Sequence, residues 1–241
     1  MDKNIIKKAK SSTMIPGLDI LKFVMSLFIV AIHSEAVKEI YYVSDITEPL
    51  IGSAVPVFFV VSSFLLFRKV RNKSKMEDIN EKGILLHFTY RLVLLYAFWF
   101  IVQLPLVVYT RHYLSMNLLE FLGNFILDIV FRSTFHGAWF FSALVVGSWI
   151  IFLRGKIIND KVIWILPFII TMYTYHVNNL PAEQQVLWNW YYENIINPQN
   201  SFPVSLFWIS MGFIMANPKF IKYMSNIKSY YLVGGAFSHG S

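Results

Sequence analysis

Four polar side chains share one face of an apolar stretch near the N-terminus, residues 15–36. They are Asp19, Lys22, Ser26 and His33. At about 100° per helical residue, Lys22 and His33 have nearly the same heading, and the other two lie within about 60° of it. The spacing predicts a helix with one polar stripe about 20 Å long, which is typical of a site wall or a substrate pathway. The alternative is that the charged groups extend to the lipid headgroups at the two ends of the helix.

His33 is the member of this stripe best suited to proton transfer. Histidine changes charge near neutral pH, so a neutral imidazole can take a proton from a hydroxyl group. Arg91, at the start of a later apolar run, could bind a phosphate through two hydrogen bonds. Its alternative role, and that of the cations in residues 68–75, is to anchor a helix at the membrane surface.

Composition places these residues in a membrane protein. Of 241 residues, 56% are hydrophobic, 17% aromatic and 15% charged, whereas an average soluble domain has about 25% charged residues. This excludes a disordered chain, a disulfide-stapled secreted domain and an ordinary cytosolic enzyme. The chain has no cysteine, which excludes zinc–thiolate sites and a cysteine nucleophile. It also has no Gly-rich phosphate loop, H-E-x-x-H or G-x-S-x-G motif, so we expect no metal and no permanently bound cofactor.

Apolar runs near membrane-spanning length recur along the chain and must position the polar residues. They cover residues 15–36, 49–67, 84–110, 137–153, 161–177 and 203–217, and another starts near residue 229. The run 118–131 is shorter and carries Asn124 and Asp128, so it could cross the membrane or lie at its interface. We predict an all-α, polytopic transmembrane helix bundle of about six to eight spans. It forms a single domain over residues 1–241.

Basic residues predict the orientation of these spans. They gather before the first run and in residues 68–82, 154–161 and 217–228, whereas the connection after the first run is acidic apart from Lys38 and residues 178–202 contain no basic residue. Basic connections are cytoplasmic as a rule, so we expect a multi-pass protein of the plasma membrane with a cytoplasmic N-terminus. This alternation holds if residues 118–131 do not cross. The net charge of +7 then reflects topology and needs no nucleic-acid partner; the bilayer is the partner it indicates.

Four short motifs follow one another over about residues 14–150. They are Gly17-Leu-Asp19-Ile-Leu-Lys22-Phe with Val30-Ala-Ile-His33-Ser, then Ala54-Val-Pro56-Val-Phe58-Phe59-Val-Val-Ser62-Ser63-Phe64-Leu65, Tyr90-Arg91-Leu92, and Gly137-Ala-Trp139-Phe140-Phe141-Ser142-Ala143-Leu144. In this order they resemble the membrane acyltransferase-3 family. Its elements are L-D-x-[LI]-[RK] before a histidine, V-P-x-F-F-x-x-S-G-F-L, R-R or R-L, and L-W-F-L-x-A-L.

The resemblance implies transfer of an acyl group, commonly acetyl, from cytosolic acyl-CoA to a hydroxyl of an extracytoplasmic glycan or related acceptor. Acyl-CoA is then a co-substrate, and a sugar or wall polymer is the other partner. Residue by residue, the resemblance implies catalytic roles for His33 and Lys22. It makes Arg91 the third candidate, for acyl-CoA binding. We also predict that Arg68 and Lys69 help to bind acyl-CoA and that Trp139 and Ser62 contact the acceptor.

The sequence departs from the family pattern in three places. Lys22 stands where many members have arginine, which replaces a two-pronged phosphate contact by a point charge. Ser63 stands where the family has glycine, and Leu144 and Val145 stand where some branches carry a carboxylate. Family domains usually have about ten spans, so we expect a C-terminally truncated member. The alternative functions are a transporter or exporter that uses the same polar stripe, and a non-catalytic membrane domain.

Overall fold

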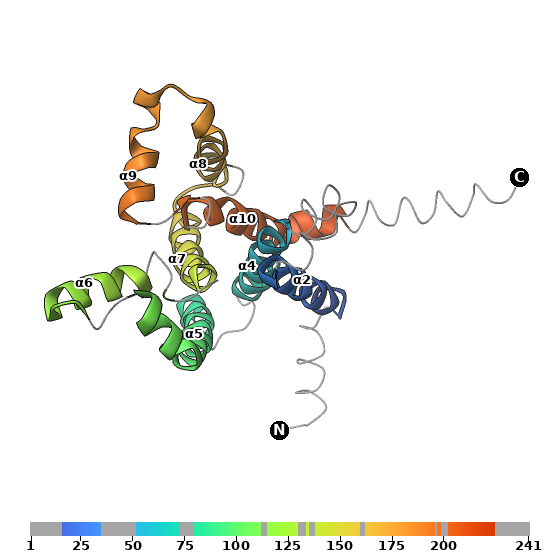
Figure 1. Ribbon diagram of the computed structural model, residues 1–241. Helices are drawn as coiled ribbons and strands as arrows, with labels where there is room; N and C mark the ends of the chain where they lie inside the picture. Colours follow the sequence, from blue (N-terminus) through green and yellow to red (C-terminus); the bar gives the residue numbers. More distant parts are fainter. Residues whose placement is uncertain are drawn as a thin grey trace, which may run out of the picture. The chain divides into compact units, whose positions relative to one another are not determined.

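The computed structural model describes residues 16–34, 52–72, 80–111, 115–129, 134, 138–159, 162–195, 197–198 and 202–224. Every element in these ranges is a helix (Figure 1), which confirms the all-α prediction. The α-helices are α2 (Pro16–Ser34), α4 (Ala54–Asn72), α5 (Glu81–Arg111), α6 (Leu118–Leu127), α7 (Trp139–Arg154), α8 (Ile165–His176), α9 (Val186–Asn194) and α10 (Phe202–Met215). Two single 3₁₀ turns, η4 (Val177–Asn179) and η5 (Ala182–Gln184), precede α9.

The chain divides into two compact units, Met1–Val61 and Ser62–Ser241. The first contains α2 and the first half of α4, and the second contains the rest of α4 and all later helices. Each unit is described by itself below. The single domain expected over residues 1–241 stays a prediction, because grouping by contacts does not show which parts fold independently.

Six of the predicted apolar runs coincide with helices. The runs 15–36, 49–67, 84–110, 137–153, 161–177 and 203–217 correspond to α2, α4, α5, α7, α8 and α10. The run expected near residue 229 lies outside the described residues. Helix α9 falls in residues 178–202, where we expected only a connection. Its Trp188 is buried, so packing of one large side chain accounts for an ordered helix in a largely polar segment.

Helix α5 is the clearest membrane-crossing element in the part of the chain that the structure describes. It has 31 residues, or about 46 Å, and over Glu81–Tyr109 it is long and apolar enough to cross a bilayer. Phe202–Met215 and Pro218–Met224 meet the same criteria only together, with a 74° bend between them. The number of spans therefore stays a prediction.

Helices α5 and α7 pack antiparallel in a constant register. Three pairs define it: Lys156 Nζ lies 3.6 Å from Glu81 Oε2, Trp149 Nε1 donates to Thr89 Oγ1 at 3.0 Å, and the Tyr96 and Phe141 rings lie 6.2 Å apart. The start of α5 therefore meets the end of α7.

The connection between α5 and α7 contains α6, which begins with a capping box. Asn117 Oδ1 accepts from the Glu120 N–H at 3.0 Å, and Glu120 Oε2 accepts from the Asn117 N–H at 3.3 Å. At 10 residues, α6 is about 15 Å long, half of the hydrocarbon thickness of about 30 Å. Whether residues 118–131 cross the membrane stays open.

A seam of small residues joins α7 to α10. A Cβ added to Gly147 would collide with Ile209 Cδ1 and would lie 3.6 Å from Ser205 Oγ. One added to Gly155, at the end of α7, would lie 2.7 Å from Phe213 Cζ. Residue numbers rise together along both helices, so α7 and α10 run parallel, with α8 packed on α10 through Phe168 and Phe207 at 5.6 Å. The absence of side chains at the glycines permits this close approach.

Candidate functional site

Helix α2, in the first unit, carries the whole predicted polar stripe. Lys22 Nζ and Asp19 Oδ1 form an ion pair at 3.1 Å, and Ser26 Oγ donates to the Phe23 carbonyl at 2.6 Å. His33 is the last residue but one of α2, and its side chain is outside the described ones. The ion pair lowers the cost of placing two charges in an apolar helix. It also fixes the Lys22 ammonium along the stripe.

The ends of four helices meet in the second unit and form a surface that we name the cationic end. Arg71, at the end of α4, lies over the Phe213 ring of α10 with 4.2 Å to its centroid. Gly155 of α7 packs on the same ring, and the Lys156–Glu81 pair joins α7 to the start of α5. The basic residues of the cationic end are Arg68, Lys69, Arg71, Lys82, Arg154, Lys156, Lys219 and Lys222. Glu81 is the one described acidic residue among them.

Arg71 is the cation whose position is best defined. Its Nε and Nη2 atoms are shielded from solvent, and Phe67, one turn earlier, packs edge-on against the same Phe213 ring at 4.9 Å. Arg68 is half-buried and Lys69 is exposed. Sequence reasoning selected Arg68 and Lys69 and missed Arg71. The available signal was the four-residue spacing of Phe59, Ser63 and Phe67, which are all buried and whose helix face Arg71 continues.

Arg91 does not join the cationic end. It lies 10 residues beyond the start of α5, about 15 Å along the helix. Its heading differs by about 150° from that of Thr89 and Tyr96, which face α7. Its side chain is exposed beside that of His87. The structure thus brings Arg68 and Lys69 together and leaves Arg91 on another face.

The two residues expected at the acceptor lie away from the cationic end. Trp139 begins α7 at the end opposite to Arg154, about 22 Å away. Ser62 is half-buried in α4, about 9 Å before Arg68. Lys22 and His33 belong to the first unit, so the fold of neither unit fixes their distance from these residues.

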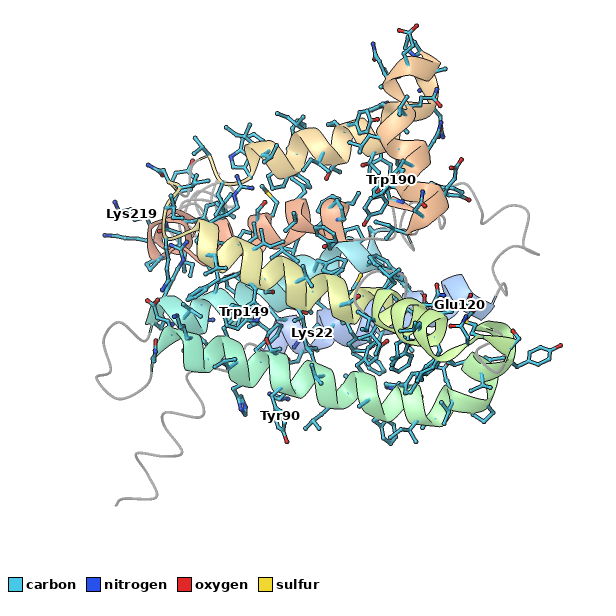
Figure 2. All side chains as sticks on the ribbon, turned by 90° about the vertical axis from the view of Figure 1, so that its left-hand side faces the viewer. Lys22, Tyr90, Glu120, Trp149, Trp190 and Lys219 are labelled. Atoms are coloured by element: carbon cyan, nitrogen blue, oxygen red, sulfur yellow. The ribbon has the colours of Figure 1, made fainter. Side chains whose placement is uncertain are left out.

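The opposite end of the second unit is lined with aromatic rings, and we name it the aromatic end. Its rings are Tyr96, Phe100, Phe121, Phe125 and Phe141, packed around buried Val107 and Ala138. Tyr96 Oη and Thr134 Oγ1 share a hydrogen bond of 2.6 Å. Figure 2 shows Lys219 and Glu120 at opposite ends of this unit, with α5 running between them. Charge and aromatic surface are therefore separated along the helix axes.

Metal chemistry has no visible site in the described ranges. No three His, Asp or Glu side chains among these residues gather closely enough to hold a metal ion. The chemistry available here is proton transfer by histidine and recognition of anions by cations.

The geometry alone does not distinguish an acyltransferase from a transporter or a non-catalytic membrane domain, and the comparison with protein families gives the family. Residues 15–240 match the acyltransferase-3 family, described as an acyltransferase domain. The chain belongs to the acyltransferase-3 family. This membrane-associated family accounts for the long, exposed apolar helix α5 and for the motifs on α2, α4, α5 and α7.

Two similar curated proteins carry a different name. Both are named amino-acid racemase, from Enterococcus faecalis. One is 30% identical over 135 residues, which is 55% of this chain and 17% of the racemase. The other is 26% identical over 148 residues, which is 60% of this chain and 20% of the racemase. The matched segment thus spans a fifth or less of each relative. No solved structure matches this chain.

The structure explains two features of the family motifs in this chain. The acidic and basic residues of the first motif, Asp19 and Lys22, are an i,i+3 ion pair, so their spacing follows from helix geometry. Ser63, where acyltransferase-3 members have glycine, is fully buried. Its small side chain is accommodated within α4, and the departure from glycine leaves that helix continuous.

Proposed function

We propose that this acyltransferase-3 member transfers an acyl group, most simply acetyl, from cytosolic acyl-CoA to a hydroxyl of an extracytoplasmic glycan or related acceptor. The observation that carries the proposal is the cationic end, where four helix termini present eight basic side chains and one acid among the residues that the structure describes. Coenzyme A has three phosphate groups, and such a surface favours a polyanion. The positive-inside rule assigns this end to the cytoplasm, where acyl-CoA is found.

The donor site is proposed at the cationic end. Arg71 is held in place by Phe213, so its guanidinium loses little conformational freedom on binding a phosphate. Arg68 and Lys69 lie one turn or less before it on α4 and add charge. Arg91 lies about 15 Å along α5 from the start of that helix. It is proposed to contact a part of the elongated donor that lies further from the cationic end.

The chemistry is proposed to take place at the polar stripe of α2. His33 takes the proton of the acceptor hydroxyl, and the hydroxyl oxygen attacks the thioester carbonyl. The carbon–sulfur bond then breaks, the new ester bond remains, and the coenzyme A thiolate receives the proton from His33. In a second version, the acyl group first rests on His33 and then passes to the hydroxyl. Lys22 supports the charge that develops, and Trp139 and Ser62 contact the acceptor.

The test is acetyl transfer in isolated membranes supplied with radiolabelled acetyl-CoA. His33→Ala should lower acceptor labelling about 100-fold or more, since general acid–base catalysis contributes about 10²–10⁴ in rate. His87→Ala, which removes an exposed histidine of α5, is the matched control and should retain labelling. Wild-type labelling that persists in His33→Ala membranes would overturn the assignment.

Orientation can be tested separately because the chain has no cysteine. A single cysteine at Lys219 should react with a membrane-impermeant maleimide only after the cells are permeabilised. A single cysteine at Glu120 should react on intact cells. The reverse pattern would place the cationic end outside, away from acyl-CoA.

A second candidate function is transport of an amino acid. It rests on the polar stripe of α2, and the two similar proteins named amino-acid racemase make an amino acid the substrate to test. The polar stripe of α2 would then line a pathway rather than support chemistry. Vesicles containing the protein would accumulate a radiolabelled amino acid, and acetyl-CoA would label no acceptor.

A further inference from the structure

Helices α5 and α6 form the walls of an open apolar slot at the aromatic end. Its volume is about 550 Å³, within the range of about 300–1,000 Å³ of small-molecule sites. The lining residues are Phe100, Leu104 and Val108 of α5, Met116 before α6, and Leu118, Phe121 and Phe125 of α6. None of these described lining residues is charged.

The slot walls are held in place by ring contacts. Phe121 and Phe125 stack at 5.3 Å, and Phe125 packs edge-on against Phe100 at 5.9 Å across the two helices. Asn124 Nδ2 donates to the Glu120 carbonyl at 3.0 Å and to Met116 Sδ at 3.8 Å. These contacts fix α6 against α5, so the slot is part of the folded unit.

Water is a poor occupant for this space. A water molecule in a cavity needs two to four polar partners, and cavities lined by apolar side chains stay dry. The slot is open on one side, since two of its lining residues, Leu104 and Leu118, are 41% and 71% exposed. An apolar ligand is the occupant that suits the walls.

The surroundings indicate which apolar ligand is available. The outward face of α5 beside the slot is apolar and exposed, for example at Ile101 and Val102. The exposed face of α6 carries Leu119 and Ile126. In a membrane-associated family these faces meet hydrocarbon, and the slot is continuous with them. The polar capping box of Asn117 and Glu120 marks one end of α6, where a polar headgroup finds hydrogen-bonding partners.

We propose that this slot binds one hydrocarbon chain of a membrane phospholipid, with its headgroup near the capping box. The chain lies between Phe100, Leu104 and Phe121 and covers the apolar surface that these residues present to the slot. This site is separate from the donor and acceptor sites proposed above and does not depend on the acyl-transfer activity.

The test uses the purified full chain in phosphatidylcholine vesicles that contain a phosphatidylcholine with a photoactivatable diazirine in one acyl chain. After irradiation, mass spectrometry locates the adducts. We expect the slot residues to carry at least fivefold more adduct than Ile101, which is 68% exposed on the same helix. Equal labelling at the slot and at Ile101 would indicate ordinary surrounding lipid and overturn the proposal.

Two matched variants test the occupancy of the slot itself. Leu104→Trp fills the slot and should lower slot adducts at least fivefold, whereas Ile101→Trp adds a similar volume on the lipid-exposed face and should change them less than twofold. Val108→Phe fills the slot from another side and should lower slot adducts at least fivefold as well. It replaces Leu104→Trp as the test variant if Leu104→Trp does not elute as a single species in detergent. Slot adducts that persist in the filled variants would overturn the proposal. The proposal would also be overturned if a polyprenyl phosphate lowered the slot adducts and excess phosphatidylcholine did not. The slot would then bind a lipid-linked acceptor.

Discussion

The cationic end and the aromatic end lie at opposite ends of the antiparallel pair α5 and α7, yet different contacts hold their defining side chains. At the cationic end, Arg71 and Lys156 are held by a ring and a carboxylate. At the aromatic end, the contacts are ring against ring around one hydroxyl pair, Tyr96 and Thr134. The first end is suited to an anionic ligand and the second to a hydrocarbon one.

The difference shows how one helix pair can carry two kinds of surface at its two ends. The register from Glu81–Lys156 to Tyr96–Phe141 is constant, so the two ends are rigidly joined within this unit. Between them, α5 presents apolar side chains outward and crosses the distance with hydrogen bonds to its own backbone. Function at either end then depends on the packing that keeps these helices in place, including the seam between α7 and α10.

The largest effect is expected where the seam between α7 and α10 is closest. Gly147→Leu would drive a side chain into Ile209 and Leu206, and overpacking of this kind costs about 1–3 kcal/mol or more. We expect a loss of about 3 kcal/mol in the free energy of unfolding, measured by titrating SDS into detergent micelles. Both ends should lose function together.

The matched control for the seam is Gly123→Leu in α6, where an added Cβ meets nothing within 4 Å. It should leave stability unchanged or raise it slightly, because leucine favours helix more than glycine does. Equal losses in the two variants would mean that the α7–α10 seam is not the source of the effect.

A smaller effect, confined to one end, is expected from Arg71→Ala. If the guanidinium binds a phosphate of the donor, its removal costs about 1.5–3 kcal/mol, or about tenfold to a hundredfold in the KM for acetyl-CoA. Lys69→Ala, which removes an exposed cation two residues away, should raise this KM only about twofold. The kcat of both variants should change little, and lipid labelling of the slot should not change.

Arg71→Ala can also show that Arg71 does not bind the donor. A loss of stability in Arg71→Ala with an unchanged KM for acetyl-CoA would reduce Arg71 to a packing residue on Phe213. The positions of the other basic residues would then reflect membrane topology alone.

Features of the fold and the site that depend on neighbours in the sequence could be predicted, whereas features that depend on contacts between distant segments could not. Hydropathy predicted α2, α5 and α10, and helix geometry placed Asp19 and Lys22 within reach of each other. The choice of Arg71 among neighbouring cations was not readable, because it depends on Phe213, which is far away in the sequence. The α5–α7 register and the slot likewise depend on contacts between segments whose pairing no local pattern encodes.

Helices α6 and α9 show the same limit in short segments. The pattern Asn117-x-x-Glu120 is a capping-box signal that could have predicted the start of α6 from the sequence. Helix α9 has no such signal, since no side chain caps its start. The burial of Trp188 is a tertiary contact, so α9 could be found only in the folded chain.

The smallest effect is expected at the aromatic end, from Tyr96→Phe. The variant keeps the ring packing on Phe141 and removes the hydrogen bond to Thr134, whose side chain is almost fully buried. A hydrogen bond of this kind contributes about 1 kcal/mol, which should appear in the same SDS titration. Thr134→Val should cost a similar amount, and the double variant should cost little more than either alone, because both remove one shared interaction. Additive losses would show that the two hydroxyls act independently, and a change in the KM for acetyl-CoA would show that the two ends are coupled.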